Sequence, residues 1–190
     1  MPHPDNIEIV KRYTDKQYGT DIKLHNCEDK NQRFDIYAED RNFHLSIEYK
    51  NREFDDDTQK YMKRDDILIE QVQTLPYFVN NCIPTNGNII RFYNVTQVNT
   101  AIGWFYKCDA DRLYYIKYFN NHFHEIVDIA FRAFKSWFLN NTHLFNPQYS
   151  DKTTGTINAE VPYIQIPSPL ITVIDKNGNK RTEFYAEVDD

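Results

Sequence analysis

The sequence predicts an α/β fold, with α+β as the alternative, built around one central mixed β-sheet flanked by helices. Apolar residues recur at helical spacing in two segments, and many shorter segments are apolar and strand-prone. No internal repeat, low-complexity tract or composition shift divides the 190 residues. We therefore expect a single domain over residues 1–190, with a core over about 5–140 and a C-terminal strand and hairpin extension over about 143–190.

Two segments have the apolar spacing of an amphipathic helix. The first covers Pro4–Tyr18, in which Ile7, Val10 and Tyr13 lie at helical intervals. The second is the longest predicted helix and runs from His122 to about Asn140, with apolar residues at intervals of three and four. We interpret its apolar stripe as core packing. The stripe consists of Phe123, Val127, Ala130, Phe131, Phe134, Trp137 and Phe138.

Short segments with strand character fill much of the remaining chain. Polar Asp40–Asn42 separates Phe34–Glu39 from Phe43–Lys50, so these two segments are expected to pair as a tight antiparallel hairpin. Asn177-Gly178 predicts a second hairpin, and the charged segment Asn51–Asp66 predicts an exposed loop. The predicted strands are Asp21–Cys27, Phe34–Glu39, Phe43–Lys50, Ile67–Val72, Ile89–Tyr93, Ala101–Lys107, Leu113–Phe119, Tyr163–Ile166, Leu170–Ile174 and Thr182–Tyr185.

Composition is that of an ordinary soluble globular protein. No apolar run approaches the roughly 18 to 20 residues that a membrane-spanning helix needs. The polar segment Met1–Asp15 has the features of neither a secretory signal nor a transit peptide, so we expect a cytoplasmic protein without a membrane partner. Cys27, Cys82 and Cys108 are odd in number and widely spaced, which argues against a disulfide framework and a structural zinc site.

One polar constellation points to chemistry: Asp35, followed in the next predicted strand by Glu48-Tyr49-Lys50. Period-two alternation puts Glu48 and Lys50 on the same face of their strand, opposite Ile47 and Tyr49. By the same alternation, Asp35 lies on the polar face of the neighbouring strand. If the two strands pair as a hairpin, two carboxylates and one ammonium group converge on one patch.

Such a patch suits phosphodiester hydrolysis. The carboxylates of Asp35 and Glu48, with the backbone carbonyl of Tyr49, can hold Mg²⁺ or Mn²⁺ and leave several water ligands in place. A metal ion polarises the phosphate and lowers the pKa of a bound water. Lys50 can orient the attacking water or neutralise charge on the phosphoryl oxygens. The alternative reading is a solvated salt bridge, because this spacing of an acid and a lysine is short and common.

The order of elements resembles the restriction-endonuclease-like core of the PD-(D/E)XK nuclease superfamily. That order is a helix, a strand, a strand with Asp35, a strand with Glu48 and Lys50, and then further strands and a helix. The resemblance covers about Asp21 to Phe119. Many members have proline immediately before the first acid, where this chain has phenylalanine, and we identify no counterpart for the C-terminal third.

A second similarity lies in three segments of the middle of the chain. Ile67–Gln73 (ILIEQVQ), Ala101–Trp104 (AIGW) and Asp109–Tyr118 (DADRLYYIKY) are similar to a pattern in small phage-encoded members of the superfamily. There, an apolar strand ending in I-E precedes a G-I or G-W strand and an A-D element. Within that last element, we expect Asp111 to cap a turn and not to bind metal.

The resemblance implies a DNA endonuclease that depends on Mg²⁺ or Mn²⁺, phage-encoded or resolvase-like, with catalytic residues Asp35, Glu48 and Lys50. It suggests a metal-supporting acid at Glu8, as in resolvase-like members, and a supporting carboxylate at Glu70. An exposed basic rim beside the catalytic strand is expected to contact DNA. Its members are Arg52, Lys60, Lys63 and Arg64.

Other functions remain open at this point. The formal net charge of −6 does not favour a nucleic-acid partner, although a nuclease clusters carboxylates and only the field near its substrate matters. The alternatives are a catalytically inactive binding protein on the same fold and a phage assembly protein. Nucleases of this size often pair to cut both strands, so a homodimer is one expected assembly. The form of the DNA and its sequence are left open.

Overall fold

The computed structural model describes residues 5–20, 22–27, 34–41, 43–54, 65–72, 82–85, 89–92, 103–145, 147–149 and 157–184. In chain order the elements are α1 (Asn6–Tyr18), β1 (Lys23–Asn26), β2 (Ile36–Glu39), β3 (His44–Phe54), β4 (Asp66–Val72), β5 (Cys82–Thr85), β6 (Ile89–Phe92), α5 (Trp104–Lys107), β7 (Arg112–Phe119), β8 (His122–Ala130), α6 (Phe131–Asn140), η2 (Thr142–Leu144), β9 (Pro147–Tyr149), β10 (Ile157–Pro162), η3 (Tyr163–Gln165), η4 (Ser168–Leu170), β11 (Ile171–Asp175) and β12 (Lys180–Arg181).

The fold is α+β, with a central mixed sheet of seven strands in the described part of the chain. The strand order is β1-β2-β3-β7-β8-β11-β12, and the neighbouring strands are antiparallel except for the parallel pair β3 and β7. A second sheet has the order β4-β10-β9, and β5 and β6 form a two-stranded ribbon. The prediction of a central mixed sheet with helices is thus confirmed.

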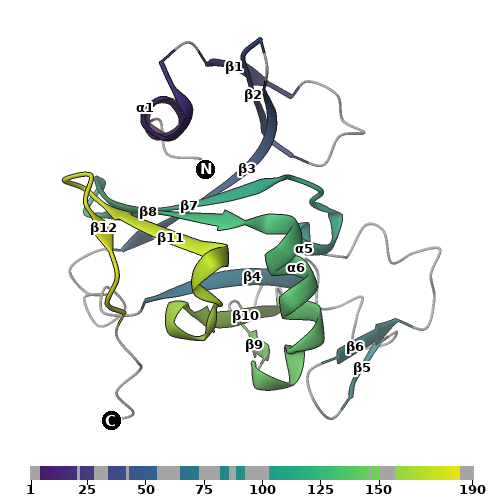
Figure 1. The fold of residues 1–190 in the computed structure, drawn as a ribbon. Coiled ribbons are helices and arrows are strands. Elements are labelled where there is room, and N and C mark those ends of the chain that lie inside the picture. Colours follow the sequence, from purple (N-terminus) through teal and green to yellow (C-terminus); the bar gives the residue numbers. More distant parts are fainter. Residues whose placement is uncertain are drawn as a thin grey trace.

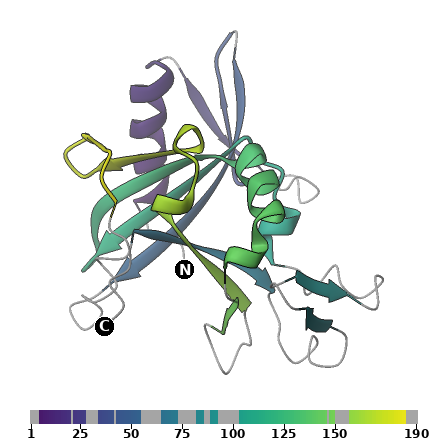
Figure 2. The same ribbon diagram turned by 60° about the horizontal axis from the view of Figure 1, so that its bottom comes forward.

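The two faces of the central sheet are covered differently (Figure 1). Helix α1 lies over one face, where Val10 and Tyr13 pack with Ile47 and Tyr114. Helix α6 and the small β4-β10-β9 sheet lie on the other side, and Figure 2 shows this second layer from below. Because both faces are covered, the central strands β7 and β8 are buried along most of their length.

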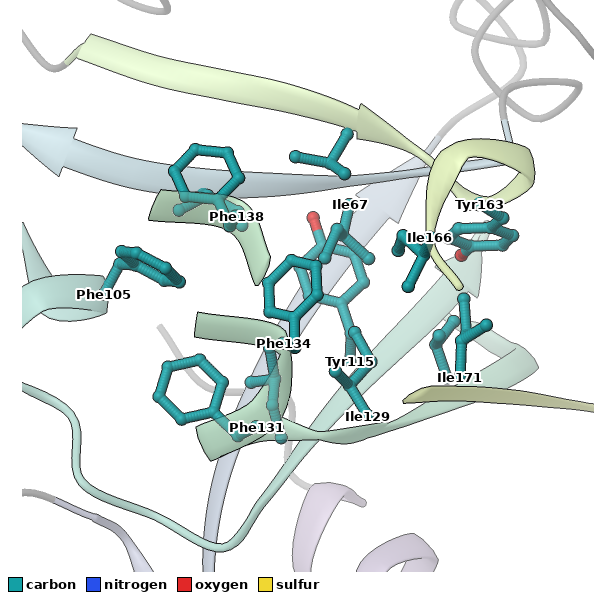
Figure 3. Packing of buried hydrophobic residues seen from close by; sticks show 14 of the residues in the cluster. Ile67, Phe105, Tyr115, Ile129, Phe131, Phe134, Phe138, Tyr163, Ile166 and Ile171 are labelled. Carbon is teal, nitrogen blue, oxygen red and sulfur yellow. The ribbon is translucent and has the colours of Figure 1, made fainter. Parts of the chain in front are cut away.

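The larger core cluster fills the space between the central sheet and the second layer. Figure 3 shows three phenylalanines of α6 pointing into it, together with Ile67 from β4 and Tyr115 from β7. These α6 residues are Phe131, Phe134 and Phe138, and they are fully buried. This confirms that the C-terminal half of the predicted apolar stripe is core packing.

The N-terminal elements follow the predicted pattern closely. Helix α1 is confirmed over Asn6–Tyr18, although its buried face uses Ile9, Val10 and Tyr13, while the side chain of Ile7 is 41% exposed. The predicted hairpin is confirmed as the antiparallel pair β2 and β3. Strand β3 continues to Phe54, so the first part of the predicted Asn51–Asp66 loop is strand. Residues 55–64 of that loop lie outside the described residues.

The prediction of one long helix over His122–Asn140 is wrong in its first half. Residues 122–130 form β8, which pairs with β7 on one side and β11 on the other. Strand and helix were hard to separate because β8 is buried on both faces, so its apolar residues do not alternate with polar ones and also fit helical spacing. The missed signal is Asn120-Asn121, whose φ angles of 46° and 62° make the tight turn between β7 and β8.

Besides the second strand of the C-terminal hairpin, two predicted strands are wrong, and β5, β9 and β10 were not predicted. In place of a strand over Ala101–Lys107, the described residues from Gly103 onward form the single turn α5. In place of a strand over Tyr163–Ile166, the chain forms the 3₁₀ turn η3. Strands β9 and β10 fall where the sequence predicts irregular chain. These segments are short, so their local patterns are weak compared with their tertiary contacts.

The predicted C-terminal extension is interleaved with the core. Strand β10 pairs with β4, and β11 pairs with β8 at the centre of the molecule. The hairpin predicted at Asn177-Gly178 is confirmed, with Gly178 at φ 82°, but its second strand is Lys180–Arg181 and not Thr182–Tyr185. No helix in the described ranges is both long enough and apolar enough to cross a bilayer.

Candidate functional site

The structure brings Asp35, Glu48 and Lys50 together on the face of the central sheet that also carries the larger core cluster. Asp35 lies immediately before β2, and its N–H donates to the Ile47 carbonyl of β3 (3.0 Å). Lys50 Nζ forms an ion pair with Glu48 Oε1 and lies 3.8 Å from Asp35 Oδ2. We call these three residues the carboxylate–lysine cluster. The predicted convergence of two carboxylates and one ammonium group is present.

Asp35 is held by the backbone of the strand that carries the other two residues. The N–H of Tyr49 donates to Asp35 Oδ2 at 3.0 Å. A strand residue directs its N–H and its carbonyl to the same side, so the Tyr49 carbonyl also points toward Asp35. Strand β2 pairs only as far as the register Ile36 with Ile47, which leaves this part of β3 beyond the end of β2. The predicted carbonyl ligand is therefore on the same side as Asp35.

The carboxylate–lysine cluster reaches the surface through two of its members. The side chains of Asp35 and Lys50 are 37% and 30% exposed, whereas that of Glu48 is 8% exposed. Glu48 thus lies beneath the other two groups. A ligand approaching from solvent meets Asp35 and Lys50 first.

The electrostatics of the cluster are unbalanced. Burial raises the pKa of Glu48, Lys50 lowers it and the charge of Asp35 raises it, which together bring it to about 7. Burial on its own would lower the pKa of Lys50, but the attraction of Glu48 and Asp35 outweighs burial and raises it. When all three groups are ionised, the cluster carries one negative charge in excess.

A second ionic network on the same face of the sheet differs in this respect. Arg181 pairs with Asp65 at 2.7 Å and also with Glu125, and Lys117 lies 3.3 Å from Glu125. Arg52 pairs with Asp66 at 2.8 Å. Within these pairs three cations face three carboxylates, and the charge of Glu160 also acts on Arg52. We call the six residues of these pairs the interior ion-pair network.

The pKa values reflect this balance. Burial raises the pKa of Glu125, but Lys117 and Arg181 outweigh burial and the net shift is downward. The pKa of Glu48 shifts the opposite way, because among the described residues burial and the charge of Asp35 outweigh the attraction of Lys50. Of these two networks, we therefore expect an added cation to stabilise the carboxylate–lysine cluster.

Three residues line the cluster on the side of the second layer. Lys50 Nζ lies over the ring of Trp104, 5.2 Å from its centroid. The N–H of Trp104 donates to Glu70 Oε1 of β4 at 3.3 Å. Cys108 is buried next to Glu48, and burial, with the charge of Glu48, raises the pKa of its thiol to about 12. The thiol therefore stays protonated at neutral pH and is a poor metal ligand.

Sequence reasoning assigned no role to Trp104, because Ala101–Lys107 was predicted as a strand. The available signal was Gly103, whose lack of a side chain suits the start of a turn. Glu70, predicted as a supporting carboxylate, contacts the backbone of Trp104. Asp111 accepts hydrogen bonds from the N–H and hydroxyl of Ser46 and so ties the start of β7 to β3.

The structure does not bring every predicted residue to the cluster. Glu8 is exposed on α1, which covers the opposite face of the sheet from Glu48. Arg52 is largely buried against Asp66 and Phe54, so it does not lie on an exposed rim as predicted. Lys60, Lys63 and Arg64 lie outside the described residues.

The donor set of the cluster fits Mg²⁺ or Mn²⁺. These ions prefer oxygen ligands, and Mg²⁺ is often held by one or two carboxylates with water completing the shell. Asp35 and Glu48 supply the carboxylates, and the Tyr49 carbonyl lies on their side of β3. Within the described ranges, no set of three or more His, Cys, Asp or Glu side chains is arranged to hold a metal ion. An ion held here would keep most of its water ligands.

No protein-family model, curated protein or solved structure matches this chain.

Proposed function

We propose that this protein is a divalent-metal-dependent nuclease that hydrolyses phosphodiester bonds of DNA at the carboxylate–lysine cluster. The observation that carries the proposal is the convergence of Asp35, Glu48 and Lys50 on one partly exposed patch with an excess negative charge.

Asp35 and Glu48, with the Tyr49 carbonyl, are the residues that would hold Mg²⁺ or Mn²⁺. When bound, the ion supplies charge stabilisation at the phosphate and lowers the pKa of a coordinated water. Asp35 is prepared for this role because the Tyr49 N–H fixes the position of its carboxylate. Glu48 is prepared because its partial burial makes the approach of a cation favourable.

Lys50 supplies the positive charge of the site. Its raised pKa keeps Nζ protonated at neutral pH, so it can donate to a phosphoryl oxygen as negative charge develops there. Its side chain is 30% exposed, so a phosphate can reach it without a rearrangement of the sheet. The paired carboxylates hold it close to the position that the substrate would occupy.

The order of elements supports nucleic acid as the substrate. Helix α1 and β1 come first, Asp35 immediately precedes β2, and Glu48 and Lys50 follow on β3. This agrees with the order expected for a restriction-endonuclease-like core of the PD-(D/E)XK superfamily. DNA is accordingly the proposed partner, and the exposed side of Asp35 and Lys50 is the proposed place of the scissile phosphate.

The test is cleavage of supercoiled plasmid and of a four-way junction, with Mg²⁺, Mn²⁺ or EDTA. We expect nicking that requires metal, and a loss of about 10²- to 10³-fold in Lys50→Ala and Asp35→Ala. Lys176→Ala is the matched control. Lys176 is exposed in the turn between β11 and β12, which lie toward the opposite edge of the central sheet from β2 and β3.

Thermal unfolding of each variant accompanies the assay, so that loss of folding is separated from loss of chemistry. Cleavage that persists in both site variants would contradict the proposal. The absence of metal-dependent cleavage by folded wild type on both DNAs would also contradict it, and would favour a binding protein.

A further inference from the structure

Trp104 is placed to restrict the motion of Lys50. Lys50 Nζ lies over the Trp104 ring at 5.2 Å from its centroid, which is within the range of a cation–π contact. The ring is itself held in the larger core cluster, where it stacks on Phe131 and meets Phe105 edge-on, both at 6.1 Å between centroids. A lysine side chain has four rotatable bonds, so a fixed aromatic wall removes conformations that it would otherwise sample.

Glu70 in turn holds the backbone of Trp104. Trp104 is the first residue of the single turn α5, and the N–H groups of a first turn have no partner within the helix. The preceding residue, Gly103, has no side chain that could cap this turn. Glu70 Oε1 on β4 accepts the Trp104 N–H at 3.3 Å and so supplies the missing acceptor from another strand.

We infer that Trp104 and Glu70 are positioning residues for Lys50: Glu70 fixes the start of α5, and the Trp104 ring fixes the lysine ammonium beside the two carboxylates. This inference rests on the proposed function for its consequence in catalysis. It differs from the role expected from the sequence, in which Glu70 is a supporting carboxylate of the site. Neither residue acts on the substrate.

The consequence for the reaction is specific. A lysine that is already in place needs no reorganisation when charge develops on the phosphate, so its placement affects the transition state more than substrate binding. Loss of the Trp104 ring should therefore lower kcat by about tenfold and leave KM nearly unchanged. Loss of folded protein would also lower the apparent kcat at unchanged KM, so kcat is normalised to the folded fraction of each variant.

The decisive readout is the chemical reactivity of Lys50, which does not depend on any cleavage activity. An amine-reactive reagent is applied to folded protein, and the labelling rate of Lys50 is measured by peptide mass spectrometry with exposed Lys176 as the internal reference. We expect labelling to be about two- to tenfold faster in Trp104→Leu than in wild type, and intermediate in Trp104→Phe. Phe138→Leu is the matched control, because it removes a buried aromatic ring of the same cluster that packs on Phe105 and Phe134.

Glu70 is tested by a pair of variants. Glu70→Gln keeps a side-chain oxygen that can accept the Trp104 N–H, whereas Glu70→Ala removes it. As a positioning residue, Glu70 should tolerate glutamine and not alanine, in both Lys50 labelling and kcat. If glutamine is as damaging as alanine, the negative charge is what matters and the positioning role of Glu70 is overturned.

The two proposals fail in different ways. If folded wild type cleaves no DNA, the proposed function fails while Lys50 labelling still tests the positioning. If Lys50 labels at the wild-type rate in Trp104→Leu and in Glu70→Ala, the positioning inference is overturned whether or not the protein is a nuclease.

Discussion

Asp35 and Tyr49 are joined by a hydrogen bond of 3.0 Å in which the backbone N–H of β3 donates to the carboxylate that precedes β2. This bond continues the pairing of the hairpin beyond Ile36, the first strand residue of β2, with a side chain in place of a backbone carbonyl. It places the negative charge of Asp35 beside Glu48 and Lys50, where burial has already raised the pKa of Glu48. The expectations below follow from this arrangement and from the fold around it.

Asp35→Asn separates the structural role of this residue from its charge. Asparagine keeps an oxygen that can accept the Tyr49 N–H, so the unfolding temperature should stay close to that of wild type. The loss of one of two carboxylates should weaken Mn²⁺ binding by at least about tenfold, because each carboxylate is a large part of the attraction for the ion. Isothermal calorimetry measures the affinity. Equal affinity in wild type and Asp35→Asn would exclude Asp35 as a metal ligand.

Metal binding should strengthen as the pH rises through about 7, the pKa of Glu48 in the absence of metal. At pH 6 only about a tenth of Glu48 is ionised, and at pH 8 about nine tenths. A carboxylate must be ionised to bind the ion, so the affinity for Mn²⁺ should rise by several-fold over this range. In Glu48→Gln this pH dependence should disappear along with most of the affinity. Binding that is constant from pH 6 to pH 8 in wild type would contradict the expectation.

Glu48 should also make the metal-free protein less stable as the pH rises. Its folded pKa of about 7 lies above the ordinary value of 4.5, so the folded state binds more protons between these values and the free energy of unfolding falls. Glu48→Gln removes this dependence. Relative to wild type, the variant should gain about 2 to 3 kcal/mol between pH 4.5 and pH 8, measured by urea unfolding with EDTA.

Arg181→Leu should destabilise the protein strongly without affecting metal binding. The substitution leaves Asp65 and Glu125 buried without the guanidinium that bridges them, a change that typically costs about 3 to 5 kcal/mol. Exposed Lys180→Leu is the matched control on the same strand. Mn²⁺ affinity should be unchanged, because the interior ion-pair network does not include Asp35 or Glu48. A cost below about 1 kcal/mol in urea unfolding would contradict the importance of this bridge.

The interior ion-pair network should also make stability depend on pH, but in the opposite direction to Glu48: its contribution is lost as the pH falls. The pKa of Glu125 is lowered by Lys117 and Arg181, which outweigh the effect of burial. Its contribution to stability is therefore present above its ordinary pKa of 4.5 and is lost as the pH falls through the lowered value. Glu125→Gln should reduce the loss of stability between about pH 5 and pH 3, measured by urea unfolding at each pH.

Local patterns were sufficient for the N-terminal elements. The spacing of Val10 and Tyr13 predicts α1, and the polar Asp40–Asn42 between two alternating segments predicts the β2–β3 hairpin. The same alternation brings Glu48 and Lys50 to one face, because the side chains of a strand point to opposite faces in turn. The three members of the carboxylate–lysine cluster could therefore be named from the sequence.

The middle of the chain shows where local patterns fail. Strand β8 and helix α6 were merged into one helix, because a strand buried on both faces has no clean alternation and its apolar residues also fit helical spacing. Glu125 is buried in β8 beside Lys117 of the neighbouring strand, and its other partners, Arg181 and Tyr163, come from distant parts of the chain. No local pattern contains that information.

The sequence by itself determined which residues share a face and which carry charge, because alternation and composition are properties of neighbours in the chain. Only the tertiary structure decided the surroundings of the carboxylate–lysine cluster. The pairing of β10 with β4 builds the second layer, in which Glu70 of β4 holds Trp104 and the Trp104 ring lies beside Lys50. The burial of Glu48 and the rise of its pKa depend on packing between segments far apart in sequence, and packing of that kind exists only in the folded chain.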